Sequence, residues 1–294
     1  MRRLLPLAAA LAVLAPGPAH AGGALRVVAA ENMWGSIAAQ LGGNRVQVTS
    51  IITNPATDPH EYEPSGIDAR TLAQAQLVVV NGIGYDTWAT QLLAANPVKG
   101  RVELDVGDLV GLHPGDNPHQ WYSPPNVQRV IAAITRDYTT LDPRDASYFA
   151  EQKRAFETRG LAQYKQLIAA IAKRYRGVPV GASESIFAPL ADALGLRLLT
   201  PSSFLKAISE GTEPTAADTT AIDNQIATHA IKVWVLNSQN STPDVARITA
   251  AARKRGIPVA TVTETLSPAN ATFESWQVAE LRALAAALHA ATAR

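Results

Sequence analysis

Leu77-Val78-Val79-Val80 is the stretch that decides the fold, because it is apolar at every position. A strand with no polar face belongs in a parallel sheet that helices cover on both sides. Other strands are expected on either side of it, at Leu25–Ala30, Val46–Ile52 and Arg101–Leu104. Helical patterns separate these strands, at Met33–Leu41, Ala69–Ala75, Thr87–Ala94 and Val127–Leu141. The alternation predicts an open parallel α/β sheet in the first half of the chain.

The middle of the chain breaks this alternation with one long helical segment. Asp142-Pro143 is typical of an N-cap followed by proline at the first helical position. No proline follows before Tyr175, and large side chains recur at helical spacing at Tyr164, Leu167, Ile168, Ile171 and Tyr175. A helix over residues 143–175 would be about 50 Å long, enough to reach across two lobes. Gly160 is expected to mark a bend in it, because glycine is unfavourable inside a helix.

The second half returns to alternation and predicts a second lobe. Strands are expected at Val178–Ala182, Leu196–Leu199, Val233–Leu236 and Pro258–Val262. Helices are expected at Ile186–Leu194, Ala216–His229, Pro243–Arg255 and Thr272–Ala293, with a polar loop over Ser203–Pro214. The fold class is therefore α/β, with two open parallel-sheet lobes joined by one long backbone helix and a ligand cleft between them. The expected boundaries are 22–142 for the N-terminal lobe, 143–175 for the helix and 176–294 for the C-terminal lobe.

The first residues have the pattern of a secretory signal peptide over residues 1–21. Met1-Arg2-Arg3 is basic, Leu4–Leu14 is apolar, and Ala19-His20-Ala21 is a small-x-small cleavage signal. The apolar run is too short to cross a membrane as a helix. With cleavage near Ala21 and no cysteine to carry a lipid, we expect a periplasmic protein without a lipid anchor. No membrane insertion of the mature chain is expected.

Composition excludes several classes of protein. The 26 basic and 25 acidic residues give a net charge of +1, which offers no basic face for nucleic acid. The absence of cysteine excludes a disulfide framework and a thiolate metal site.

Two short loops present a histidine directly after a proline. One is Asp58-Pro59-His60 and the other is Asn117-Pro118-His119. Proline fixes the backbone angle φ, so each imidazole is held on a stiff loop. Since the chain has only six histidines, the matching loops suggest one site built from both. Taken singly, each would more often be a surface histidine than a ligand.

Two carboxylates follow predicted strands of the second lobe within two residues. These are Glu184, after Val178–Ala182, and Glu264, after Pro258–Val262. Ligands of open α/β sheets bind beyond the carboxyl ends of the strands. Two imidazoles and two carboxylates form a suitable ligand set for a divalent transition metal. The alternatives are a helix-N-terminal role for Glu184 and a turn role for Glu264.

The remaining histidines are weaker candidates. His113 is interpreted as a surface residue, with an accessory metal contact left open. His229 and His289 fall within predicted helices and are interpreted as structural or exposed.

The chain resembles the metal-specific substrate-binding proteins of ABC importers, the zinc and manganese type, also called cluster A-I. The motifs that carry the resemblance are Asp58-Pro59-His60, Asn117-Pro118-His119-Gln120-Trp121 and Ser183-Glu184-Ser185-Ile186-Phe187. The resemblance implies two α/β lobes, one long connecting helix and a metal ion between the lobes. It implies capture of one zinc or manganese ion per chain and delivery to a membrane permease, by a monomer that is not an enzyme.

Carried over by position, the metal ligands implied by the resemblance are His60, His119, Glu184 and Glu264. Glu184 stands where zinc members commonly have histidine and manganese members glutamate, and Glu264 stands where the family commonly has aspartate. Oxygen ligands favour manganese by type, whereas intrinsic affinity favours zinc over manganese. Zinc and manganese therefore both remain open, with iron a third choice.

The main alternative is a secreted zinc-dependent hydrolase. Hydrolytic zinc sites usually have three protein ligands and an open position, whereas four protein ligands leave less room for a reacting water. The sequence also has no His-Glu-x-x-His helix and no Gly-x-Ser-x-Gly turn. A binding protein for a solute other than a metal is a further alternative.

Overall fold

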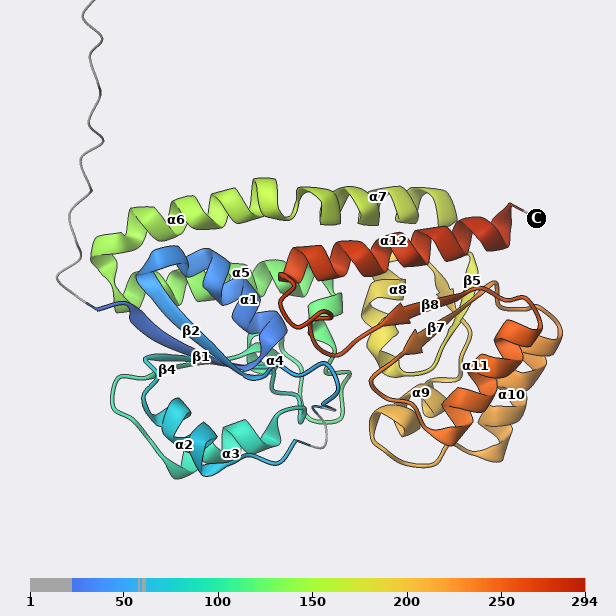
Figure 1. Cartoon of the computed structure of the whole chain (residues 1–294), viewed down its shortest axis with the longest axis horizontal. Helices are drawn as coiled ribbons and strands as arrows, with labels where there is room; N and C mark the ends of the chain where they lie inside the picture. Colours follow the sequence, from blue (N-terminus) through green and yellow to red (C-terminus); the bar gives the residue numbers. More distant parts are fainter. Residues whose placement is uncertain (1–22, 58, 60–61, 294) are drawn as a thin grey trace, which may run out of the picture.

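The computed structural model describes residues 23–57, 59 and 62–293. The predicted signal peptide and His60 lie outside the described residues. Within those residues the chain forms two parallel four-stranded sheets, one in each lobe (Figure 1). The expected α/β fold class with two parallel-sheet lobes is confirmed.

The N-terminal sheet has the strand order β2-β1-β3-β4. Its strands are β1 (Leu25–Glu31), β2 (Val46–Ile52), β3 (Leu77–Val80) and β4 (Val102–Asp105). β3 lies inside the sheet, where Val79 is paired with Ala29 and Leu104. Leu77 and Val79 join the core cluster on one face, and Val78 and Val80 join a separate cluster on the other. The continuous apolar run arises because successive side chains point to opposite faces and both faces are covered.

The C-terminal sheet repeats this order as β6-β5-β7-β8. Its strands are β5 (Pro179–Ala182), β6 (Arg197–Leu198), β7 (Val233–Asn237) and β8 (Val259–Val262). Val233 and Val235 face the same core cluster as the N-terminal sheet, whereas Trp234 faces the cluster on the outer side. The two lobes therefore share one topology, and one continuous core cluster extends across both.

Helices cover both faces of each sheet. In the N-terminal lobe they are α1 (Asn32–Gly42), α2 (Gly66–Ala73), α3 (Thr87–Ala95), α4 (Val106–Val110) and α5 (Pro124–Leu141). In the C-terminal lobe they are α8 (Ala188–Leu194), α9 (Ser202–Ser209), α10 (Ala216–Ala227), α11 (Pro243–Lys254) and α12 (Phe273–Thr292). None of the helices in the described residues has the length and apolar character needed to cross a bilayer.

Two helices differ from the sequence-based expectation. The polar loop expected at Ser203–Pro214 was wrong, because α9 occupies most of it and buries Phe204, Leu205 and Ile208. Those three residues share one helical face, a signal that the surrounding polar residues obscured. α4 was not predicted at all, since its five residues are too few to show a periodic pattern.

The connecting segment over residues 143–175 is helical throughout most of its length. It contains the 3-10 turn Pro143–Asp145, α6 (Ala146–Ala155), a π-helical turn (Phe156–Gly160) and α7 (Ala162–Tyr175). α6 runs along the N-terminal lobe and α7 along the C-terminal lobe (Figure 1). The predicted span across both lobes is confirmed, while a single unbroken α-helix is corrected to two helices.

Gly160 ends the π-helical turn, at the position where the bend was predicted. A Cβ atom there would lie 2.8 Å from the Phe156 ring, so any other residue would require the ring to shift. Glycine therefore fits this turn without displacing Phe156.

The closing helix α12 forms a second connection between the lobes. It packs against α7 and against α1 of the N-terminal lobe. At its start the Phe273 backbone N–H donates to Ser36 Oγ at 2.9 Å, and Gln40 Nε2 donates to Glu274 at 2.8 Å. The lobes are thus held by α12 as well as by the α6–α7 segment, which the sequence did not indicate.

Candidate metal centre

His119 lies on the stiff loop before the 3-10 turn Gln120–Tyr122, and its side chain is fully buried. Asn117 Oδ1 accepts from the His119 backbone N–H at 3.0 Å and lies 2.7 Å from the ring Nδ1. Asn117 Nδ2 donates to the Ser185 carbonyl, so the amide oxygen is the atom turned toward the ring. The Asn-Pro-His motif therefore orients its own histidine, with Nδ1 toward Asn117 and Nε2 toward the space between the lobes.

Aromatic rings enclose the imidazole. Trp121 lies edge-on to it with ring centroids 5.2 Å apart, and Tyr85 lies at 6.1 Å. Both rings are buried. They exclude water from the site, which strengthens the electrostatic interactions inside it.

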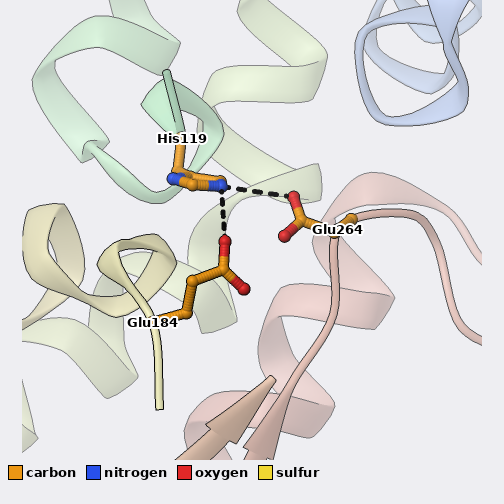
Figure 2. Close-up of side chains that lie close together, drawn as sticks. All are labelled: His119, Glu184 and Glu264. Carbon is orange, nitrogen blue, oxygen red and sulfur yellow. Dashed lines mark ion pairs between the residues drawn. The ribbon is translucent and has the colours of Figure 1, made fainter. Parts of the chain in front are cut away.

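Glu184 and Glu264 approach His119 from the opposite lobe, from the loops after β5 and β8 (Figure 2). One oxygen of each carboxylate lies 3.4 Å from His119 Nε2. Both carboxylates are buried, Glu184 fully and Glu264 to within 1%. The structure thus brings together three of the four predicted ligands.

The spacing of these atoms fits a metal ion. Metal–nitrogen and metal–oxygen bonds of about 2.0–2.2 Å put neighbouring ligand atoms of a tetrahedral ion about 3.3–3.6 Å apart. The two His119–carboxylate distances of 3.4 Å fall in that range. The three donor atoms lie within 4.8 Å of one another.

Asn237 is a polar neighbour that sequence reasoning missed. It is the last residue of β7, it is fully buried, and its Nδ2 donates to Glu184 Oε2 at 2.6 Å and to Glu264 Oε1 at 2.7 Å. Tyr85 from the N-terminal lobe donates its hydroxyl to Glu264 Oε2 at 2.9 Å. Asn237 directly follows the apolar run Val233–Leu236, so the strand-end rule that found Glu184 and Glu264 would have found it too.

The charges of the site favour a cation. Burial alone lowers the pKa of His119, but the charges of Glu264 and Glu184 and their contacts with the ring outweigh it and raise the pKa to about 9. At neutral pH the imidazole therefore carries a proton in the empty site. A divalent cation would displace that proton, because a histidine must be neutral to bind metal.

A second polar network joins the two ligand-bearing loops behind the site. The Tyr122 hydroxyl, three residues after His119, accepts from the Thr263 backbone N–H at 3.2 Å and donates to Glu280 at 2.6 Å. Glu280, on α12, also accepts from Thr263 Oγ1 at 3.1 Å and from Trp276 Nε1 at 2.9 Å. Burial raises the pKa of Glu280 to about 8 despite these bonds. The network connects the loop of His119 to the residue before Glu264.

The other predicted residues lie elsewhere. His60 lies outside the described residues, although Pro59 before it is buried. His113, expected at the surface, is exposed and is not part of the cluster. His289 is exposed on α12, and His229 is exposed just after α10 ends, so its predicted place within a helix was wrong. Within residues 23–57, 59 and 62–293, His119, Glu184 and Glu264 form the one such cluster of potential ligands.

The sequence matches the ZnuA family, described as "Zinc-uptake complex component A periplasmic", over residues 27–287. The chain belongs to this family. The resemblance inferred from the Pro-His and Ser183–Phe187 motifs is therefore confirmed. Proteins of the ZnuA family are non-enzymatic transport components, in agreement with the expectation that the chain is not an enzyme.

Individual relatives cover part of the chain. The "Manganese-binding lipoprotein MntA" of Halalkalibacterium halodurans is 28% identical over 143 residues, which is 48% of this chain and 47% of that protein. The "Manganese ABC transporter substrate-binding lipoprotein PsaA" of Streptococcus pneumoniae is 27% identical over 145 residues, 45% of this chain and 46% of that protein. The chain thus spans about half the length of the curated relatives it matches.

Solved structures share the fold over nearly the whole chain. An S38A mutant, Mn-bound periplasmic metal binding protein from Candidatus Liberibacter asiaticus superposes with a TM-score of 0.76 at 21% identity, covering 90% of this chain and 99% of that one. The periplasmic zinc binding protein TroA from Treponema pallidum has a TM-score of 0.76 at 18% identity, with the same coverage.

Proposed function

We propose that this protein captures one divalent transition metal ion, zinc or manganese, between its lobes and delivers it to the membrane permease of an ABC importer. The observation that carries the proposal is the buried convergence of Glu184 and Glu264 on His119 Nε2, each at 3.4 Å. Membership of the ZnuA family, and relatives named as manganese-binding proteins, support metal as the cargo.

The proposed ligands are His60 and His119 from the N-terminal lobe, and Glu184 and Glu264 from the C-terminal lobe. All four belong to one chain, which supports one ion per chain and action as a monomer. His60 follows the buried Pro59 as His119 follows Pro118, and this repeated motif supports the inclusion of His60.

The proposed location is the periplasm, after removal of residues 1–21. The proposed division of the chain is 22–142 for the N-terminal lobe, 143–175 for the connecting helices and 176–294 for the C-terminal lobe. Contacts of α12 with α1 support treating the lobes as closely joined rather than as freely moving units.

The chain's own residues account for selective and reversible capture. The two carboxylates attract the cation, Asn117 holds the imidazole in position, and the rings of Trp121 and Tyr85 keep water out. Entry of the metal ion releases the proton on His119, so the site exchanges a proton for the metal ion. Protonation of His119 or withdrawal of one carboxylate would reverse the process.

The test is elemental analysis of the purified mature protein after reconstitution with Zn²⁺ or Mn²⁺ and desalting. We expect one ion per chain and a higher melting temperature, since a ligand that binds only the folded state stabilises it by mass action. No retained metal together with an unchanged melting temperature would overturn the proposal.

A further inference from the structure

We propose that Asn237 determines the coordination number of the bound ion by restricting Glu184 and Glu264 to one ligating oxygen each. The inference rests on the proposed metal-binding function. β7, which ends at Asn237, lies between β5 and β8 in the sheet. Its side chain is therefore at the one strand end that adjoins both carboxylate-bearing loops.

The amide of Asn237 is held in a single orientation. Its Oδ1 accepts from the Gln239 backbone N–H at 3.0 Å, and its own backbone N–H donates to Ser183 Oγ at 2.9 Å. Both hydrogens of Nδ2 are then directed at carboxylates, Glu184 Oε2 at 2.6 Å and Glu264 Oε1 at 2.7 Å. Turning the amide over would bring its oxygen against two carboxylate oxygens, so the donors face the site.

The two oxygens of each carboxylate therefore have different partners. Oε2 of Glu184 and Oε1 of Glu264 accept from Asn237, while Oε1 of Glu184 and Oε2 of Glu264 are the atoms 3.4 Å from His119 Nε2. Tyr85 further fixes Glu264 by donating to Oε2 at 2.9 Å. Asn237 thus engages one oxygen of each carboxylate, and the other oxygen of each is the one directed at His119 Nε2.

The consequence is a four-coordinate site. His119 and the two single oxygens, with His60 as the proposed fourth ligand, would make a tetrahedral set, the geometry typical of zinc, whereas manganese favours more oxygen ligands in octahedral geometry. Without the two donors, each carboxylate can bind through both oxygens and the coordination number can rise. Asn237 is therefore a positioning residue that disfavours manganese relative to zinc without touching either ion.

A simpler role for Asn237 is to relieve the repulsion between two carboxylates in the empty site. The two roles differ in the loaded protein. A residue that only relieves repulsion would change the affinity for zinc and manganese by the same factor and leave the coordination geometry as it is.

The experiment compares the unsubstituted protein with Asn237→Leu, whose side chain has a similar volume and no hydrogen-bond donor. Asn237→Ser, with a shorter hydroxyl side chain, is the second variant and serves if Asn237→Leu does not fold. Asn240→Leu is the matched control, because this amide lies in the same loop and donates to the Ile208 carbonyl instead. Each protein is loaded with Co²⁺, and its visible absorption is recorded. Zn²⁺ and Mn²⁺ affinities are measured by competition, and circular dichroism checks the fold.

We expect intense tetrahedral cobalt bands in the unsubstituted protein and in Asn240→Leu. In both Asn237 variants the bands should weaken toward those of higher coordination, and the preference for Zn²⁺ over Mn²⁺ should fall by about tenfold or more, as is usual for residues that orient metal ligands. Weak bands in the unsubstituted protein, or an unchanged spectrum and Zn²⁺/Mn²⁺ ratio in the variants, would overturn the inference. Failure of the unsubstituted protein to bind any of the three ions would instead overturn the proposed function.

Discussion

The two lobes supply the site in different ways. In the N-terminal lobe, His119 is oriented by Asn117, two residues earlier in the same loop. In the C-terminal lobe, Glu184 and Glu264 are oriented by Asn237, which is 53 and 27 positions away in sequence. One half of the site is therefore encoded in a short motif, and the other half depends on the completed sheet. Substitutions in the N-terminal half should therefore alter mainly the loop of His119, whereas substitutions in the C-terminal half should affect both carboxylate-bearing loops.

The largest effect is expected from removal of the locally encoded ligand. His119→Ala deletes a ligand and leaves two buried carboxylates without their cation, and breaking a buried charge pair costs about 3–5 kcal/mol of stability. We expect loss of metal-dependent thermal stabilisation and a lower melting temperature of the metal-free protein. Thermal unfolding with and without Zn²⁺ measures both.

The matched control for that experiment is His113→Ala. His113 is exposed and lies six residues earlier in the same region. The His113→Ala variant should retain both metal binding and stability. A full metal-dependent shift in His119→Ala would remove the N-terminal half of the site from the proposal.

The next largest effect concerns pH. Because the pKa of His119 in the folded, metal-free protein is raised to about 9 from an ordinary 6.5, its stabilising charge interactions are fully present below pH 6.5 and are lost as the pH rises toward 9. The metal-free protein should therefore become less stable over this range. Metal affinity should increase over the same range, with release of about one proton from His119 per ion at neutral pH.

Calorimetric titration in buffers of different ionisation enthalpy measures the released protons directly. Glu184→Gln removes one of the two charges that raise the pKa and should move the pH dependence to lower pH. A binding enthalpy that does not change with the buffer would show that His119 is already neutral in the empty site.

A smaller effect is expected where the two halves are joined. Tyr122→Phe removes the acceptor of the Thr263 N–H and one of the three donors to the Glu280 carboxylate, and an unsatisfied buried polar group costs about 1–3 kcal/mol. We expect reduced stability by urea unfolding and weaker metal binding, because the loops of His119 and Glu264 lose a direct connection. Tyr148→Phe is the control, since Tyr148 bonds the Asn44 backbone far from the site. Equal losses in the two variants would argue against a role in binding.

The smallest effect is expected in the connecting helices. Hydrogen exchange with and without metal should show increased protection at residues 113–124 and 262–272 and little change over 143–175, because α12 and the α6–α7 segment both hold the lobes together. Strong metal-dependent protection along 143–175, with none in the two loops, would favour a wide hinge motion instead.

Much of the fold could be read from the sequence because its signals are local. The run Leu77–Val80 predicted an interior strand, and the proline-free stretch after Asp142 predicted the connecting helices. The π-helical turn could not be placed, since it depends on how Phe156 packs beside Gly160. α9 was missed because its three large apolar residues stand among polar ones.

The residues of the candidate site also fall into those that local sequence signals predicted and those that they did not. His119, Glu184 and Glu264 were predicted from loop motifs and strand ends, and the structure brings them together. Asn237, Tyr85 and Glu280 were not predicted. Asn237 was passed over because only ionisable side chains were sought at the strand ends, and Glu280 because it lies within α12 rather than at a strand end. Their importance comes from contacts between residues that are far apart in sequence.

The contact between α1 and α12 also has a consequence for how the chain folds. α1 begins at Asn32 and α12 ends at Thr292, so the apolar face of one of the first helices to be synthesised is covered by the last. Contacts this distant in sequence slow folding, because a large loop must close before they form. The core cluster that contains Trp34 of α1 also contains Trp276 and Leu281 of α12. The core of the N-terminal lobe is therefore completed by the same helix that carries Glu280 behind the site.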